Sequence, residues 1–174
     1  MTVCLRFTRK VWKSFLDHKG PHRVRRATTM SLNRRAQLNL TRASPGRVEA
    51  TLKIAKYNLN RTNTLHGGLI LSLTDTLGSL AVATKGNFMT GVSTDIGTSF
   101  VRPGGMDGDE IHMSATLVGM GKTLAYTRVD FTNPKGELVA YGHHTKFVGK
   151  VGDHPKNVKF SEDGETLLEG EIDD

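Results

Sequence analysis

The residues with the clearest chemical potential lie in one long apolar stretch, HGGLILSLTDTLGSLAVATKG, which begins at His66. Two glycines follow His66, the first being Gly67, at the expected start of a helix. Glycines there let a ligand approach backbone N–H groups that carry the positive end of the helix dipole, as a carbonyl gaining negative charge requires. Asp75 lies in the middle of the stretch. A buried carboxylate is costly unless it is hydrogen-bonded or faces a cleft, so Asp75 is either functional or a structural aspartate bonded to Ser72 or Ser79.

The spacing of these two features restricts how they can act together. Nine residues separate His66 from Asp75, which along a helix corresponds to about 13 Å. One chain's helix start and its own aspartate cannot easily contact the same carbonyl. If both act on one substrate, the second must come from another subunit, and the site would lie across a two-fold interface with two sites per dimer.

The elements that must position these residues follow from the hydrophobic pattern. Leucines at positions 69, 73, 77 and 80 predict a helix, and Asp75 with its polar neighbours argues against a membrane span. Period-2 alternation before the helix predicts a hairpin of residues 37–42 and 47–55 around Ser44-Pro45-Gly46. Four further strands are expected after it, at Gly91–Val101, Glu110–Met120, Thr123–Thr132 and Leu138–Val148. The order predicts an α+β fold with an antiparallel sheet wrapped around one long central helix.

The charges divide the 174 residues into three parts. Residues 1–46 carry eleven Lys or Arg against one acid, and residues 151–174 carry two against eight, while the whole chain has a net charge of +7. We therefore expect a basic segment at 1–36, the domain at 37–150 and an acidic, disordered tail at 151–174. Nucleic-acid binding through a basic face is a minor alternative, because no nucleic-acid motif accompanies the charge.

The basic segment allows two interpretations. It is rich in arginine and poor in acids, and Val3, Phe7, Val11 and Phe15 recur every four residues, which is typical of a mitochondrial transit peptide. An amphipathic helix packed on the domain, in a cytoplasmic protein, fits the same pattern. The single cysteine, Cys4, excludes an intramolecular disulfide framework and a cysteine-rich zinc module.

Other candidate sites are weaker. Gly121-Lys122-Thr123 lacks the earlier glycine of a P-loop, and His143 and His144, adjacent on a strand, point to opposite faces and so suit no shared metal. No metal site or cofactor is expected. Ser93 lacks the glycines of a nucleophile elbow, and is either a plain strand serine or a hydroxyl beside Asp75.

Several segments in order, SPGRVEA, NRTNTLHGGL, GVSTDI, GKTLAYT and GHHTK, together with Asp75, resemble the hotdog-fold acyl-CoA thioesterases of the phenylacetate-degradation type. The closest resemblance is to the thioesterase superfamily member 2 subgroup. It implies hydrolysis of acyl-CoA to free coenzyme A and a carboxylic acid. The Gly67 N–H would polarise the thioester carbonyl. Asn60 would help to hold the carbonyl end of the substrate, and His66 would orient this part of the site. The partner subunit's Asp75 would activate water or attack, with Ser93 placing the water and the carboxylate.

The resemblance also implies a coenzyme A surface and an assembly. The expected contacts are Gly119, Met120, Gly121, Lys122, Thr123 and Leu124, with Lys122 facing phosphate and Arg102 and Lys146 as further contacts. Dimers joined edge to edge, usually paired into a homotetramer, are implied. No membrane span and no nucleic-acid partner are expected.

Two other functions remain open from the sequence. A hotdog hydratase or dehydratase would act on an acyl thioester through a histidine and a carboxylate. A non-catalytic module would bind acyl-CoA without releasing its thiol. The apolar residues near the helix predict an acyl tunnel that accepts fatty and aromatic groups alike.

Overall fold

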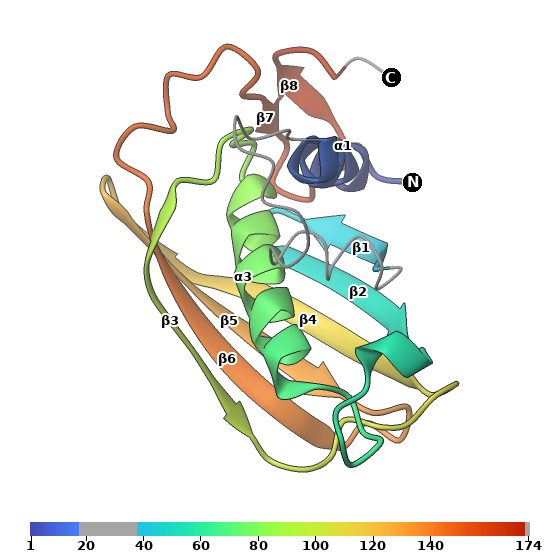
Figure 1. Ribbon diagram of the computed structural model, residues 1–174. Coiled ribbons are helices and arrows are strands. Elements are labelled where there is room, and N and C mark those ends of the chain that lie inside the picture. Colours follow the sequence, from blue (N-terminus) through green and yellow to red (C-terminus); the bar gives the residue numbers. More distant parts are fainter. Residues whose placement is uncertain (18–37, 173–174) are drawn as a thin grey trace.

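A long helix, α3 (Gly67–Ala83), lies against one face of a curved six-stranded antiparallel sheet in the computed structural model, which describes residues 1–17 and 38–172 (Figure 1). The sheet contains β1 (Asn39–Ser44), β2 (Arg47–Lys53), β3 (Val92–Phe100), β4 (Glu110–Met120), β5 (Leu124–Thr132) and β6 (Leu138–Phe147), in the order β1-β2-β4-β5-β6-β3. The expected α+β class, with the sheet wrapped around one central helix, is confirmed.

The helix is enclosed on nearly every side. Leu73, Leu77 and Leu80 are completely buried, as the leucine pattern predicts, and Val82 on the other side is also completely buried. A helix with buried residues on all sides lies inside a core, and α3 also buries four Ser and Thr side chains. Of its residues, Gly68 and Leu71 are exposed, and Gly67 and Asp75 are half-buried. The solvent-accessible positions of α3 therefore include the two candidate site residues, Gly67 and Asp75.

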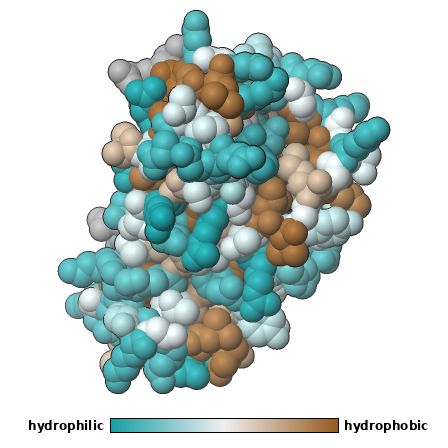
Figure 2. Space-filling model, turned by 180° about the vertical axis from the view of Figure 1, so that it is seen from behind, coloured by the Kyte–Doolittle hydropathy of each residue, from teal (hydrophilic) through white to brown (hydrophobic). Residues whose placement is uncertain are grey.

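The sheet forms because its inner positions alternate with polar outer ones. On β2, for example, Val48, Ala50 and Leu52 are buried against the helix side. The β1–β2 turn needs Gly46, whose φ of 88° is unfavourable for residues with a side chain. The face of the sheet turned away from α3 is mostly hydrophilic with separate hydrophobic patches (Figure 2). Burial therefore fixes which side of each strand faces α3.

Two terminal segments add to the core. The helix α1 (Val3–Asp17) buries Cys4, Phe7 and Val11, as expected for an amphipathic helix packed on the domain. A short 3-10 helix, η1 (Lys56–Asn58), precedes α3, and a two-stranded sheet of β7 (Lys159–Phe160) and β8 (Leu167–Glu169) lies beside α1 (Figure 1). The remainder of the predicted basic segment, residues 18–36, lies outside the described residues.

The expectation of a disordered tail is wrong for residues 151–172. Val151 and Val158 are buried, and the ring of Phe160 packs edge-on against that of Phe7 with 5.6 Å between centroids. The Cys4 N–H also donates to the Gly164 carbonyl at 3.1 Å. A few apolar residues spaced between the acids are enough to attach this segment to α1, although its composition is polar.

None of the helices in the described part of the chain is both long enough and apolar enough to cross a bilayer.

Candidate active site

Asp75 lies at the meeting point of three elements. Its side chain on α3 is 40% exposed, although the neighbouring Leu73 and Leu77 are completely buried. The Asp75 Oδ1 atom is 3.5 Å from Ser93 Oγ on β3 and 3.5 Å from His144 Nε2 on β6. Ser93 Oγ and His144 Nε2 are themselves 2.8 Å apart. The expectation of a hydroxyl beside Asp75 at Ser93 is therefore met, and His144 joins the group.

A bulge in β3 aims Ser93 at this group. Residues two apart on a regular strand point to the same face. The β3–β6 register shifts between Ser93 and Asp95, and the two side chains turn to opposite faces of the sheet. Asp95 pairs with the exposed His143 at 3.0 Å, while Ser93 bonds the buried His144. The bulge thus separates a surface ion pair from the candidate site.

A glycine on α3, Gly78, allows His144 on β6 to lie close to the helix. As expected, His143 and His144 point to opposite faces, and His144 is completely buried. A Cβ at Gly78 of α3 would lie 2.6 Å from Thr127 Oγ1 and 2.9 Å from His144 Nδ1. Such contacts are too short for a side chain, so glycine at position 78 permits the close approach of α3 to β5 and β6.

Burial keeps the His144 imidazole neutral. Its pKa falls from 6.5 to about 4, first because it is desolvated and second because the charge of Lys146 is near, while the charge of Asp75 opposes the fall. The Nδ1 atom has no hydrogen-bond partner among the described residues. A buried bare acceptor costs less than a buried bare N–H, so we assign the proton to Nε2. The imidazole then donates to Ser93, whose hydroxyl donates to Asp75 over the longer distance.

Lys146 lies inside the molecule rather than at its surface. It is only 3% exposed, and its Nζ donates to Ser79 Oγ on α3 at 2.8 Å. Burial lowers the pKa of the Lys146 ammonium, and the charge of Asp75 opposes this. The expected contact of Lys146 with a coenzyme A phosphate does not fit this position, because the ammonium is enclosed between β6 and α3. Ser79, considered as a structural partner for Asp75, instead accepts from Lys146.

The start of α3 is held by local hydrogen bonds. His66 is the N-cap, and its Nδ1 accepts from the Gly68 N–H at 2.9 Å. The Asn60 Oδ1 accepts from the N–H groups of Thr62 and Thr64, at 2.9 and 3.1 Å, so Asn60 organises the loop that leads to His66. The Leu69 and Ile70 N–H groups both donate to the His66 carbonyl. Among the described residues, the Gly67 N–H is therefore the first-turn donor without a partner, and it is suited to an anionic oxygen.

Phe100 covers the position next to Gly67. A Cβ at Gly67 would lie 3.2 Å from the Phe100 ring. Phe100 is at the end of β3 and is 57% exposed. One chain therefore places Gly67 at one end of β3 and Asp75 at the other. Eight residues separate Gly67 from Asp75, which corresponds to about 12 Å along the helix.

Apart from Lys146, the expected coenzyme A residues lie at the turn between β4 and β5 and just after the end of β3. Gly119–Leu124 form the end of β4 and the turn into β5, which the Gly121 N–H closes by donating to the Leu124 carbonyl at 2.8 Å. Lys122 is exposed there. The Arg102 guanidinium pairs with Glu137 at 2.8 Å, so a phosphate would have to compete with that carboxylate.

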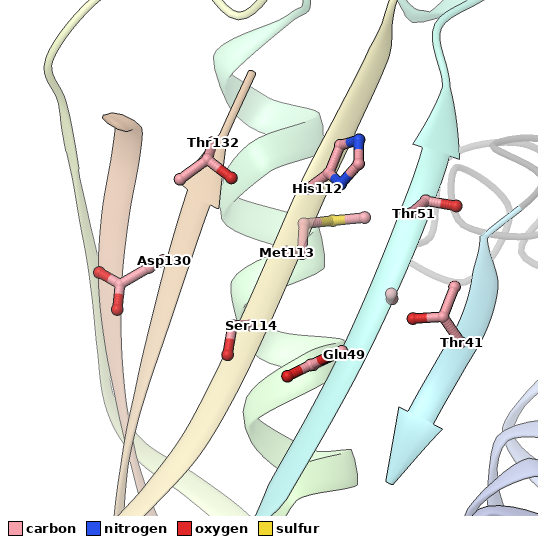
Figure 3. A pocket seen from close by; sticks show the side chains of 9 residues that line it. Thr41, Glu49, Thr51, His112, Met113, Ser114, Asp130 and Thr132 are labelled. Atoms are coloured by element: carbon pink, nitrogen blue, oxygen red, sulfur yellow. The ribbon is translucent and has the colours of Figure 1, made fainter. Parts of the chain in front are cut away.

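A shallow pocket of about 180 Å³ lies on the other face of the sheet (Figure 3). Polar side chains of β2, β4 and β5 line it, Glu49, His112 and Asp130 among them. None of its lining residues belongs to the Asp75 group or to the start of α3. This pocket is therefore separate from the candidate active site.

His144 and Gly78 were not identified as site residues from the sequence. The signal that could have found His144 is the alternation along Leu138–Phe147, which puts positions 144 and 146 on the inner face together with Ala140 and Gly142. Two titratable residues on a core-facing side need a polar partner, and Asp75 is the carboxylate available on the helix they face. Gly78 carries no comparable signal, because a close approach is visible only in three dimensions.

Comparison with known proteins identifies the family. Residues 62–140 match the family described as "Thioesterase superfamily". The chain is 39% identical over 158 residues to a Schizosaccharomyces pombe protein named as a candidate esterase, covering 90% of this chain and 91% of that protein. It is 37% identical over 114 residues to human acyl-coenzyme A thioesterase 13, covering 65% of this chain and 81% of that protein.

A solved structure supports the same classification. The crystal structure of zebra fish thioesterase superfamily member 2 is 30% identical, has a TM-score of 0.68, and aligns over 86% of this chain and 99% of that chain. The resemblance drawn from the sequence segments is thereby confirmed. This chain belongs to the thioesterase superfamily, has the hotdog fold and is a thioester hydrolase.

Proposed function

We propose that this protein hydrolyses acyl-CoA thioesters to free coenzyme A and a carboxylic acid, with Asp75 as the central catalytic residue. The observation that carries the proposal is the half-buried Asp75 carboxylate on an otherwise enclosed helix, approached by Ser93 and His144. The similarity to human acyl-coenzyme A thioesterase 13 supports coenzyme A as the thiol part of the substrate.

The arrangement suits thioester hydrolysis because it supplies a base without charging the histidine. Neutral His144 donates to Ser93, and Ser93 donates to Asp75, so Asp75 is the final acceptor. The carboxylate removes a proton from water as the water oxygen bonds to the thioester carbon, or it attacks that carbon itself. The carbon–sulfur bond then breaks, and the coenzyme A thiolate takes the proton that Asp75 removed from water or, after direct attack, a proton from solvent. After direct attack, a water molecule hydrolyses the acyl–Asp75 anhydride, which releases the carboxylic acid and restores the carboxylate. The N–H at Gly67 stabilises the carbonyl oxygen while it carries negative charge.

We propose that the carbonyl donor and the carboxylate come from two subunits. β3 is an edge strand of the sheet and carries exposed apolar side chains, Val92, Ile96 and Phe100. Such an edge favours pairing with another strand. Ser93 marks the Asp75 end of β3 and Phe100 marks the Gly67 end. Antiparallel pairing of two copies of β3 would bring the Gly67 end of one chain to the Asp75 end of its partner.

Thiol release from a panel of acyl-CoAs tests the activity. The panel contains aliphatic chains of increasing length and phenylacetyl-CoA, each with the wild type, Asp75→Asn and Asp95→Asn. We expect Asp75→Asn to lower kcat roughly 10²–10⁴-fold, because the isosteric amide cannot accept the proton. Asp95→Asn breaks the exposed pair with His143 and removes one of the charges that favour protonation of His144, so it should retain near-wild-type turnover at neutral pH, where His144 is already neutral.

Three outcomes of the panel would oppose the proposal. Undiminished turnover by Asp75→Asn would remove Asp75 from the mechanism. Tight acyl-CoA binding without thiol release would indicate a binding module. Hydration of a crotonyl thioester without hydrolysis would indicate a hydratase.

Mixing two inactive variants tests the shared site. Asp75→Asn removes the carboxylate, and Gly67→Val places a side chain where Phe100 now packs beside the helix start. If each site combines residues of two chains, random mixed dimers made by co-refolding should recover about a quarter of wild-type turnover, since half are mixed and each has one intact site. Two variants that stay inactive together, although mixed dimers form, would place the whole site in one chain.

A further inference from the structure

We infer that Lys146 is a positioning residue of this active site, whose enclosed ammonium holds the Asp75–His144 pair in the form with an ionised aspartate and a neutral histidine. The inference rests on the proposed role of Asp75. Lys146 itself is not expected to touch the substrate, because it is enclosed between β6 and α3.

The position of Lys146 follows from the spacing of residues on β6 and on α3, which face each other. His144 and Lys146 are two residues apart on β6 and share its inner face. Asp75 and Ser79 are four residues apart on α3 and lie one turn apart on the same side. His144 meets Asp75 at 3.5 Å, and Lys146 meets Ser79 at 2.8 Å. The ammonium is therefore fixed one helical turn from the carboxylate.

Among the residues that the structure describes, Lys146 is the cation that acts on the Asp75–His144 pair. Asp75 faces His144 from α3, and the negative Asp95 acts on it from β3. β5 contributes Ala125 opposite Lys146 and Thr127 opposite His144, which carry no charge. Both aspartates favour protonation of His144, and Lys146 opposes it. Without Lys146, desolvation alone would oppose the effect of the two aspartates on the imidazole.

A purely structural role explains Lys146 poorly. Burying an ammonium costs free energy, and replacing a buried charged group by an apolar one of similar size is often neutral or stabilising. Ser79 supplies one hydrogen bond to a group that can donate three. The arrangement is accounted for by its electrostatic effect on the neighbouring pair, which must remain unprotonated for Asp75 to act as a base.

The decisive variant is Lys146→Met, which keeps an unbranched side chain one atom shorter than that of lysine and removes its charge. The dependence of kcat/KM on pH reports the protonation of the free enzyme. We expect the acid limb of Lys146→Met to move to higher pH by about one unit, a loss of roughly tenfold at a pH on that limb, because the Asp75–His144 pair takes up its first proton more easily. Ser79→Ala removes the hydrogen bond that fixes the ammonium but keeps its charge, so its acid limb should move less than that of Lys146→Met. Lys53→Met, on the exposed side of β2, is the matched control for loss of a lysine charge.

A second measurement does not depend on activity. The ring resonance of His144, assigned by its loss in His144→Asn, is followed by NMR from pH 3 to pH 8. In Lys146→Met the imidazole should titrate at higher pH than in the wild type, and thermal unfolding should occur at the same or a higher temperature. A structural role predicts instead a lower unfolding temperature with an unchanged titration.

The outcomes separate this inference from the proposed function. An acid limb and a His144 titration that are both unchanged in Lys146→Met would overturn the role of Lys146, while turnover that depends on Asp75 would still stand. If the wild type released no thiol, the proposed function would fail, and the NMR titration would still decide the electrostatic role. Should Lys146→Met not fold, Lys146→Gln replaces it, and failure of both to fold would overturn the inference in favour of a structural role.

Discussion

The start of α3 and the middle of α3 are two polar regions of the same helix, and they are built differently. At the start, His66 caps the helix and Asn60 organises the loop before it, so the bonds join residues only two to four positions apart. In the middle, Asp75 meets Ser93, 18 positions away, and Ser93 meets His144, 51 positions further on. The first region depends on local geometry, and the second depends on the pairing of β3 with β6.

This difference has consequences for what each region can do. A helix start offers backbone N–H groups whatever side chains surround it, provided that glycine leaves room for the ligand. A base needs a carboxylate whose protonation is controlled, and that requires burial and neighbouring charges. The middle of the helix has the buried His144 beside its carboxylate and the enclosed Lys146 one turn further on, whereas the start is built from local hydrogen bonds.

The largest expected effect on stability concerns pH. Because the pKa of His144 is about 4 in the folded chain and near 6.5 when unfolded, the unfolded chain binds the proton first as pH falls. The resulting contribution, about 3 kcal/mol, is complete above pH 6.5 and is lost as pH falls through about 4. Urea unfolding between these limits should show a weaker pH dependence for His144→Asn than for the wild type.

The neighbour on the other face is the control for this effect. His143→Asn, at the exposed ion pair with Asp95, should retain the wild-type slope. If the unfolding free energy depended on pH equally in the wild type and in His144→Asn, the buried His144 would contribute no more to the pH dependence of stability than the exposed His143.

An intermediate effect is expected at the close approach of helix and sheet. Gly78→Ala introduces a Cβ at 2.6 Å from Thr127 Oγ1 and 2.9 Å from His144 Nδ1, so α3 must move away from β5 and β6. The cost should be about 1–3 kcal/mol in unfolding free energy, with loss of turnover because His144 shifts relative to Asp75. Chemical denaturation and thiol release measure the two effects. Unchanged stability and turnover would mean that the close approach does not hold the site.

The smallest effect is expected at the helix start. His66→Ala removes the side-chain acceptor for the Gly68 N–H and should cost about 1 kcal/mol of unfolding free energy. His66→Asn restores an acceptor at the N-cap and should recover most of that stability. If the asparagine variant were as unstable as the alanine variant, capping would not be what His66 contributes, and the start of α3 would depend on tertiary contacts as the middle does.

The sequence predicted the elements well where periodicity and turns agree. The leucine pattern located α3, and alternation between turn residues located β1, β2 and the four later strands. It failed for the acidic tail, because composition alone does not show that Val151, Val158 and Phe160 find apolar surface on the rest of the molecule. The resemblance also implied that Lys146 contacts coenzyme A, whereas the lysine is enclosed between β6 and α3, because a family resemblance does not show which side of the strand a residue occupies.

The sequence by itself determined the long apolar helix, the glycine-rich start at Gly67 and the carboxylate at Asp75, since these depend on residue types at short spacings. Only the tertiary structure decided which partners the carboxylate has. The bulge in β3 turns Ser93 inward, and Gly78 lets His144 approach the helix. The physical reason is that burial and strand register set both the direction of a side chain and its electrostatic surroundings, and neither is contained in local spacing.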